Sequence, residues 1–236
     1  EQALELHNRG LIARPNEMSF VAKLKPIYLS IAHGVGKLSQ NGFQPGELVL
    51  NGEVSVFSPP KQVKKGAPQE PDAPAIVTII SATQFWKEVT PFGTGALPQT
   101  WATEAEAIAA GKTTVYPKWG SGLPMPTARP AMNLKLLVKE PEGVCDRSHF
   151  LIETCGAFWA PCTMIADKGS FDEVQDPLTR AQITHGASGI LSATWGFSTR
   201  NKLIKSTGNY TWVPSIRIIG TKSPAESADM LKKIGG

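Results

Sequence analysis

The segment 193–220, ATWGFSTRNKLIKSTGNYTWVPSIRIIG, decides how the fold is interpreted. Two runs of strand-like composition flank a loop with three cations, Arg200, Lys202 and Lys205, and this pattern predicts a β-hairpin. Each run carries two aromatic residues spaced two apart, so its two rings share one face of the strand. We expect the four rings to pair across the hairpin. They are Trp195, Phe197, Tyr210 and Trp212.

Two roles suit this hairpin. In the first, the aromatic pairs pack a core and the basic loop is solvated. In the second, the hairpin lines a groove for single-stranded nucleic acid, because bases stack on aromatic rings and cations neutralise phosphates. The second role adds two stacking candidates, Trp159 and Trp119. Its candidates for phosphate contacts are Arg200, Lys202, Lys205, Lys135 and Lys139.

Further strands are predicted upstream of the hairpin. In 131–141, Lys135 and Lys139 alternate with apolar residues, so we expect a strand with one basic and one apolar face. The apolar positions are Leu134, Leu136 and Val138. The segment 149–166 predicts a strand pair that turns at Gly156.

Helices are predicted at three places. A short one follows Thr103, a suitable N-cap, and stops at Gly111. The segment 171–187 is one helix, or two that are divided at Pro177. A C-terminal helix has Ser223 as its N-cap and a proline at its first position.

The predicted domain organisation follows from these elements. With 22 Gly and 19 Pro in 236 residues, the chain favours short strands and many turns. We expect a helical segment at 1–20, a β domain at 21–220 and a C-terminal helix or tail at 221–236, with a long polar loop inserted at 58–75. The β domain is predicted to be mainly antiparallel (α+β), and a small closed or partly open barrel would satisfy its strand edges.

Charge, hydropathy and cysteine content indicate the kind of partner and the cellular compartment. The chain has 24 Lys and Arg against 20 Asp and Glu, a net charge of +4 that permits a polyanionic partner. No run of about eighteen apolar residues is present, so we expect no membrane contact. No signal-peptide pattern is recognisable, and 3 Cys indicate no disulfide framework. We therefore expect a cytoplasmic protein.

Residue types suited to catalysis gather in two places. The first group, whose spacing matches no common zinc site, is Cys145, His149, Cys155 and Cys162. The second suits a two-metal nuclease or a solvated helix face, and it is Asp167, Asp172, Glu173 and Asp176. There is no nucleophile elbow and no Walker loop. The sequence therefore favours a binding protein without metal or cofactor over an enzyme.

The order of these elements resembles the divergent OB-fold single-stranded DNA-binding proteins of tailed bacteriophages. The resemblance covers roughly residues 20–220, and it rests on four segments in succession. They are TIISATQFWKEV, ARPAMNLKLLVKEPEG, FLIETCGAFWAPCTMIA and GNYTWVPSIRIIG. The last is the most similar, since an aromatic-Val-Pro step leads into the final strand.

The resemblance implies an OB-like antiparallel β-barrel with added helices and long loops. Such a protein coats single-stranded DNA without sequence preference during phage DNA replication, recombination or repair, in the cytoplasm of an infected bacterial host. Replication or recombination proteins are then expected partners. The resemblance also allows the protein to form a homo-oligomer. Two alternatives remain: a metal-dependent nuclease that uses the acidic group, and a virion structural or assembly protein.

Overall fold

The computed structural model describes residues 26–60, 73–90, 96–118, 121–143, 147–186, 189–204 and 208–234. The predicted helical segment at 1–20, most of the inserted loop, and the candidates Trp119 and Lys205 lie outside the described residues. The described strands are β1 (Leu29–Ile31), β2 (Leu48–Leu50), β3 (Val54–Phe57), β4 (Ala75–Glu88), β5 (Thr100–Trp101), β6 (Ala128–Lys139), β7 (Ile152–Thr154), β8 (Ala157–Asp167), β9 (Ala193–Ile204) and β10 (Asn209–Thr221). The described helices are α3 (Lys37–Gln40), α4 (Glu104–Ala109), α5 (Gly169–His185), α6 (Gly189–Ser192) and α7 (Pro224–Lys233).

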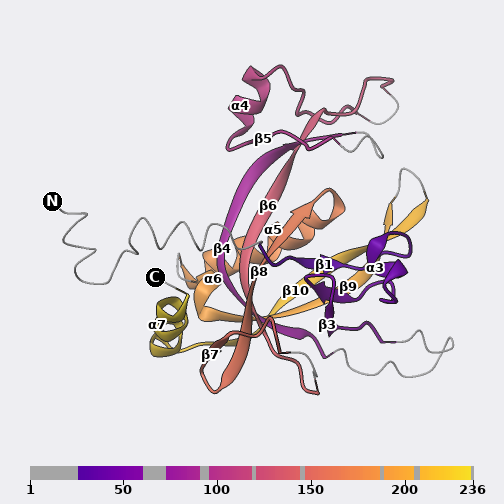
Figure 1. Ribbon diagram of the computed structural model, residues 1–236. Coiled ribbons are helices and arrows are strands. Elements are labelled where there is room, and N and C mark those ends of the chain that lie inside the picture. The colour runs from indigo at the N-terminus through magenta and orange to yellow at the C-terminus, as the bar shows by residue number, and fades with distance from the viewer. Residues whose placement is uncertain are drawn as a thin grey trace, which may run out of the picture.

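The long strands form one antiparallel sheet, which confirms a mainly β protein with added helices (Figure 1). Its strand order is β10-β9-β4-β6-β8-β7, and β5 adds to the far end of β4. Among the described residues the two edge strands of the large sheet do not pair with each other. The sheet therefore stays open and does not form the closed barrel that the sequence suggested. None of the described helices is long and apolar enough to cross a membrane.

A small antiparallel sheet of β1, β2 and β3 lies between the two outer parts of the large sheet. On one side, the Thr163 amide of β8 donates to the Ile27 carbonyl over 2.8 Å. On the other, the Thr199 hydroxyl of β9 donates to the Gly46 carbonyl over 2.6 Å. The small sheet therefore bridges the gap between β8 and the β9–β10 hairpin.

One main core fills the space between the two sheets and α5. The large sheet contributes Leu134, Leu136 and Val138, which are the apolar positions that the sequence predicted on one face of β6. The small sheet contributes Leu48 and Leu50. Helix α5 contributes four buried residues one or two turns apart: Phe171, Val174, Leu178 and Ala181.

The β9–β10 hairpin forms as predicted, but its register differs from the expected one. Trp195 lies opposite Ile218, and Trp212 lies opposite Asn201, so the aromatic residues of the two strands do not pair. The reason is distance from the turn. The rings of β9 lie seven or more residues before Ile204, the last residue of that strand, whereas the rings of β10 follow directly after the turn. Two cations assigned to the loop, Arg200 and Lys202, lie within β9.

A second feature of the large sheet is an arm built on the far ends of β4 and β6 (Figure 1). The connection between these strands carries β5 and α4. Helix α4 has the predicted cap, because the Thr103 hydroxyl accepts from the Glu106 amide over 3.2 Å. The arm has a small core of its own, in which Trp86 packs with Ala107 and Ala128. It is separate from the main core.

The structure also tests the predictions for the other two helices. Helix α7 begins with the predicted Ser223 cap, which is a full capping box with Glu226. Its Met230 packs on Leu137 of β6 and Trp159 of β8. Helix α5 runs as one helix through Pro177 and is not divided there. The predicted turn between β7 and β8 is confirmed, with Cys155 and Gly156 both at positive φ, as a two-residue type I′ turn requires.

Candidate nucleic-acid interface

The large sheet has a face that is turned away from the main core, here called the outer face, formed by β4, β6 and β8. Alternation places residues there because their neighbours in sequence enter a core. On β4 a register shift between Ile79 and Ser81 changes the phase, so that Ala82 and Trp86 face inward and Phe85 faces outward. The outer face comprises Ser81, Thr83, Phe85, Lys87, Arg129, Asn133, Lys135, Thr163, Ile165 and Asp167.

The charged side chains on the outer face are three cations and one carboxylate. Lys87 and Asp167 form an ion pair of 2.8 Å. Lys135 is exposed and Arg129 is half-buried, and neither makes an ion pair with a described residue. Two cations therefore remain available to an anion on this face.

Apolar and polar groups lie among these cations. Phe85 is half-buried and Ile165 is exposed, so both present apolar surface to solvent. The side-chain oxygen of Asn133 is buried and has no hydrogen-bond partner among the described residues. An unpaired buried acceptor costs free energy unless a ligand or water satisfies it. The face thus offers cations, an apolar ring and an unused polar atom.

A hollow of about 390 Å³ continues the outer face toward α7. Lys135 stands in its lining beside Thr163 and Pro161, and Leu231 of α7 contributes apolar surface. Trp159, which the sequence proposed for stacking, lies under α7 near this region and is buried. The helix therefore covers one end of the outer face and leaves the Lys135 end open.

Three of the aromatic candidates are corrected by the structure. Trp195 and Phe197 are fully buried, each with 0% of its surface exposed, and Trp159 is 5% exposed. Both indole groups have internal partners: Trp195 Nε1 donates to the Ile190 carbonyl over 2.9 Å, and Trp159 Nε1 to the Thr154 carbonyl over 3.2 Å. These rings pack the protein and present no face to a base in this conformation.

The two aromatics of β10 differ from each other. Tyr210 lies near the hairpin tip and is 70% exposed. Trp212 is half-buried, because its ring packs against Gly46, where a Cβ would lie 2.7 Å from the indole. Core packing, the first role suggested by the sequence, therefore holds for Trp195 and Phe197, although the rings do not pair across the hairpin. Tyr210 is the ring of the four that solvent reaches freely.

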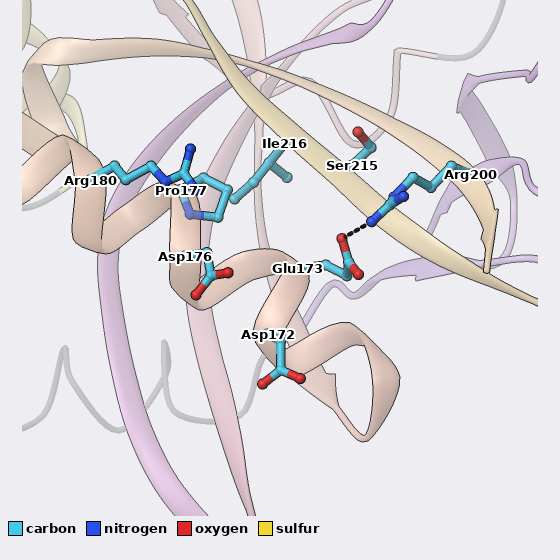
Figure 2. Close-up of a pocket in the computed structure, with 8 residues that line it drawn as sticks. All are labelled: Asp172, Glu173, Asp176, Pro177, Arg180, Arg200, Ser215 and Ile216. Carbon is cyan, nitrogen blue, oxygen red and sulfur yellow. Dashed lines mark hydrogen bonds and ion pairs between the residues drawn. The ribbon is translucent and has the colours of Figure 1, made fainter. Parts of the chain in front are cut away.

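The basic candidates of β9 are neutralised inside the protein (Figure 2). Arg200 Nη2 lies 2.6 Å from one carboxylate oxygen of Glu173, and Lys202 Nζ lies 2.7 Å from the other. Partial burial alone would raise the pKa of Glu173, but the hydrogen bonds from the two cations outweigh it and hold that pKa below its ordinary value. The remaining candidate of β6, Lys139, is half-buried.

The chain has no match among known family models, curated proteins or solved structures. The chemistry of the site is therefore inferred from the residues alone. Within the described residues no three His, Cys, Asp or Glu side chains gather to hold a metal ion. In the acidic group, Asp167 pairs with Lys87 and Glu173 pairs with two cations, so both carboxylates are already satisfied.

The residues considered as zinc ligands have separate roles where the structure describes them. Cys145 lies outside the described residues. Burial raises the pKa of the Cys162 thiol to about 12, so the thiol stays protonated at neutral pH within the core. His149 Nε2 bonds a carboxylate oxygen of Glu53 over 2.6 Å. Cys162 thus serves packing and His149 a local polar contact, whereas Cys155 is exposed in the turn between β7 and β8.

Sequence reasoning missed Arg129, Phe85 and Asn133 as members of a common face. Phe85 and Trp86 are adjacent in a strand, which already predicts that the two rings point to opposite faces. Nothing in the sequence marks the register shift after Ile79, which decides which of the two rings faces the core.

Proposed function

We propose that this protein binds single-stranded DNA on the outer face of β4, β6 and β8, without sequence preference. One observation carries the proposal. The outer face presents unpaired cations and apolar surface on the strands where an OB-fold protein binds oligonucleotides.

The strand order supports this comparison. The five long strands follow in the chain as β4, β6, β8, β9 and β10, and the sheet arranges them as fifth, fourth, first, second and third. Helix α5 connects the third to the fourth. Joining the third strand to the fifth would produce a five-stranded barrel of the OB type. Here the small sheet lies between those two strands: the Ile27 carbonyl accepts from Thr163 of β8, and Gly46 packs against Trp212 of β10.

The same comparison supports the surface that we propose for binding. OB-fold proteins bind oligonucleotides on the face of the second and third strands and on the loops that join strands one to two and four to five. In this chain these parts are the outer face of β6 and β8, the arm, and the β9–β10 turn. The arm exposes Tyr116 and the hairpin exposes Tyr210. Both loops thus supply a ring on which a base can stack.

The binding energy would come from two sources. Arg129 and Lys135 neutralise phosphates and release counterions, which makes the affinity depend on salt. Stacking of bases on exposed rings such as Tyr210 adds about 1–3 kcal/mol per base. Both interactions are available from every base and every phosphate, so the binding would not depend on sequence.

Fluorescence anisotropy with labelled dT30 tests the proposal. We expect tight binding at 50 mM salt, weaker binding to a duplex of equal length, and a steep loss of affinity with salt. Lys135→Ala should lower the slope of log K against log salt by about 0.7, the value for one phosphate contact on a single strand.

Lys37→Ala is the matched control, since Lys37 is an exposed lysine on α3, away from the outer face. The proposal fails if dT30 does not bind at 50 mM salt, or if the two lysine variants lose the same slope. Incubation of labelled DNA with Mg²⁺ tests the nuclease alternative, for which cleavage is the diagnostic result.

A further inference from the structure

We propose that Arg200 and Lys202 form a second phosphate-binding site, which Glu173 occupies while the protein is free. The Glu173 carboxylate takes the place of a phosphate group, and a bound DNA strand must displace it. This inference rests on the proposed function for its ligand, although its geometry is independent of the outer face.

The contacts around Glu173 have the form of a bound anion. Each carboxylate oxygen accepts from a different cation, Arg200 at 2.6 Å and Lys202 at 2.7 Å. Lys202 also donates to the Gly169 carbonyl over 3.4 Å. Phosphate groups are recognised by the same charge-assisted bonds from Arg and Lys. The site is therefore built to hold an anion, and a side chain of the same protein supplies it.

A hollow next to this group leaves room for a ligand. Its volume is about 560 Å³, and it lies between α5 and the β9–β10 hairpin. Figure 2 shows Arg180 and Arg200 reaching it from opposite sides. The Ser215 hydroxyl also lines it. An incoming phosphate would meet Arg180 in addition to the pair that Glu173 holds, and it would also lie near the carboxylates of Asp172 and Asp176.

Exposure of the partners makes displacement feasible. The side chain of Glu173 is 15% exposed, whereas that of Arg200 is 56% exposed and that of Lys202 is 36% exposed. The cations are thus open to solvent on the side away from the carboxylate. A polyanion can therefore approach both cations from solvent and replace the carboxylate.

The same helix supplies a matched control. Asp172 and Asp176 line the hollow but form no ion pair with a described residue. Asp172→Asn removes the same charge as Glu173→Gln without releasing a cation. The difference between these two variants therefore measures the release alone, free of the general effect of one less negative charge.

The experiment measures dT30 binding between 50 and 200 mM salt for wild type, E173Q and D172N. Release of two cations adds two phosphate contacts, so the affinity of E173Q should fall by roughly sevenfold more than that of wild type over this range. D172N should follow wild type. E173A, checked by circular dichroism, repeats the test without an amide that can still accept from Arg200.

Two further arms separate this inference from the proposed function. Adding R200A and K202A to E173Q should abolish its gain. Titration with pyrophosphate should show tighter binding by E173Q than by wild type, whether or not the outer face binds DNA. The inference is overturned if E173Q and D172N behave alike, or if R200A and K202A leave the gain of E173Q intact. Loss of dT30 binding in K135A leaves the inference intact and tests only the outer face.

Discussion

Gly46 shows how one residue fixes the position of a predicted ligand-binding ring. Its φ of +95° is open to glycine at low cost, and its Cα faces the Trp212 indole so closely that a Cβ would lie 2.7 Å from the ring. A Pro59 atom lies 2.9 Å from the same position. The indole therefore packs on Gly46, next to Pro59, and this contact explains why Trp212 is only partly exposed.

Substitution of Gly46 should expose this packing. We expect Gly46→Ala to lower the free energy of unfolding by about 1–3 kcal/mol more than Gly42→Ala does, as for other overpacked sites. Gly42 is the control because its φ is +92° but nothing lies within 4 Å of the place that a Cβ would take, so it reports backbone strain alone. Urea denaturation measures both. Equal losses would show that the ring gives way without cost.

The exposure of individual side chains was the property hardest to predict from the sequence. The sequence singles out the aromatic residues of 193–220, but it does not show which face of each strand is covered. Trp195 is buried because β9 is central in the sheet at that point, paired with both β4 and β10. Tyr210 has the same strand character and is exposed because it lies beyond the core. The difference arises from tertiary position and leaves no local signal.

At the scale of elements, Glu173 joins α5 to β9 through its two ion pairs. Its pKa is below the ordinary value in the folded protein, so the folded state binds the proton more weakly than the unfolded chain does. This contact therefore adds stability at pH values above the unfolded pKa. The contribution is lost as the pH falls through the folded pKa.

A pH series of denaturation curves tests this link. The free energy of unfolding of wild type should fall between neutral pH and about pH 3 by more than that of E173Q, which has no carboxylate at this position. The two proteins should converge in acid. Parallel curves across the whole range would contradict the assignment of the ion pairs as a link between α5 and β9.

Elements with local signals were predicted well. Thr103 and Ser223 are both N-caps as expected, because a capping hydroxyl acts on amides within its own turn. The register of β9 with β10 was not, because it is set jointly by the turn and by the cores on each face. The strands β1 and β2 pair with each other, and β2 pairs with β3, but the contacts of their sheet with β8 and β9 join residues that are more than a hundred positions apart.

At the scale of the whole molecule, the arm and the rest of the described fold, here called the body, have separate cores. Several large apolar side chains of the arm are exposed: Leu97, Ile108, Val115, Tyr116, Leu123 and Met125. The body also exposes large apolar side chains, such as Ile165, Ile183 and Tyr210, around the core between its two sheets and α5. The separate core of the arm is therefore the feature that sets it apart.

Removal of the arm should therefore separate stability from binding. We expect replacement of residues 91–125 by an Asn-Gly turn to leave a folded body with the near-ultraviolet circular dichroism of its buried tryptophans. Affinity for dT30 should fall roughly tenfold, which corresponds to loss of one stacking contact of about 1–3 kcal/mol at Tyr116. An unfolded product would show that the arm supports the body, and unchanged affinity would remove the arm from the interface.

The position of the small sheet in the chain has a consequence for biosynthesis. Its buried leucines, Leu48 and Leu50, are translated before any strand of the large sheet. The partners that cover the small sheet, near Thr163 and Thr199, follow more than a hundred residues later. At about 5–20 residues per second, this leaves an interval of roughly 6–30 s. During that interval the apolar side chains of the small sheet lack the partners that cover them in the folded protein, and we expect them to be a binding site for a ribosome-associated chaperone.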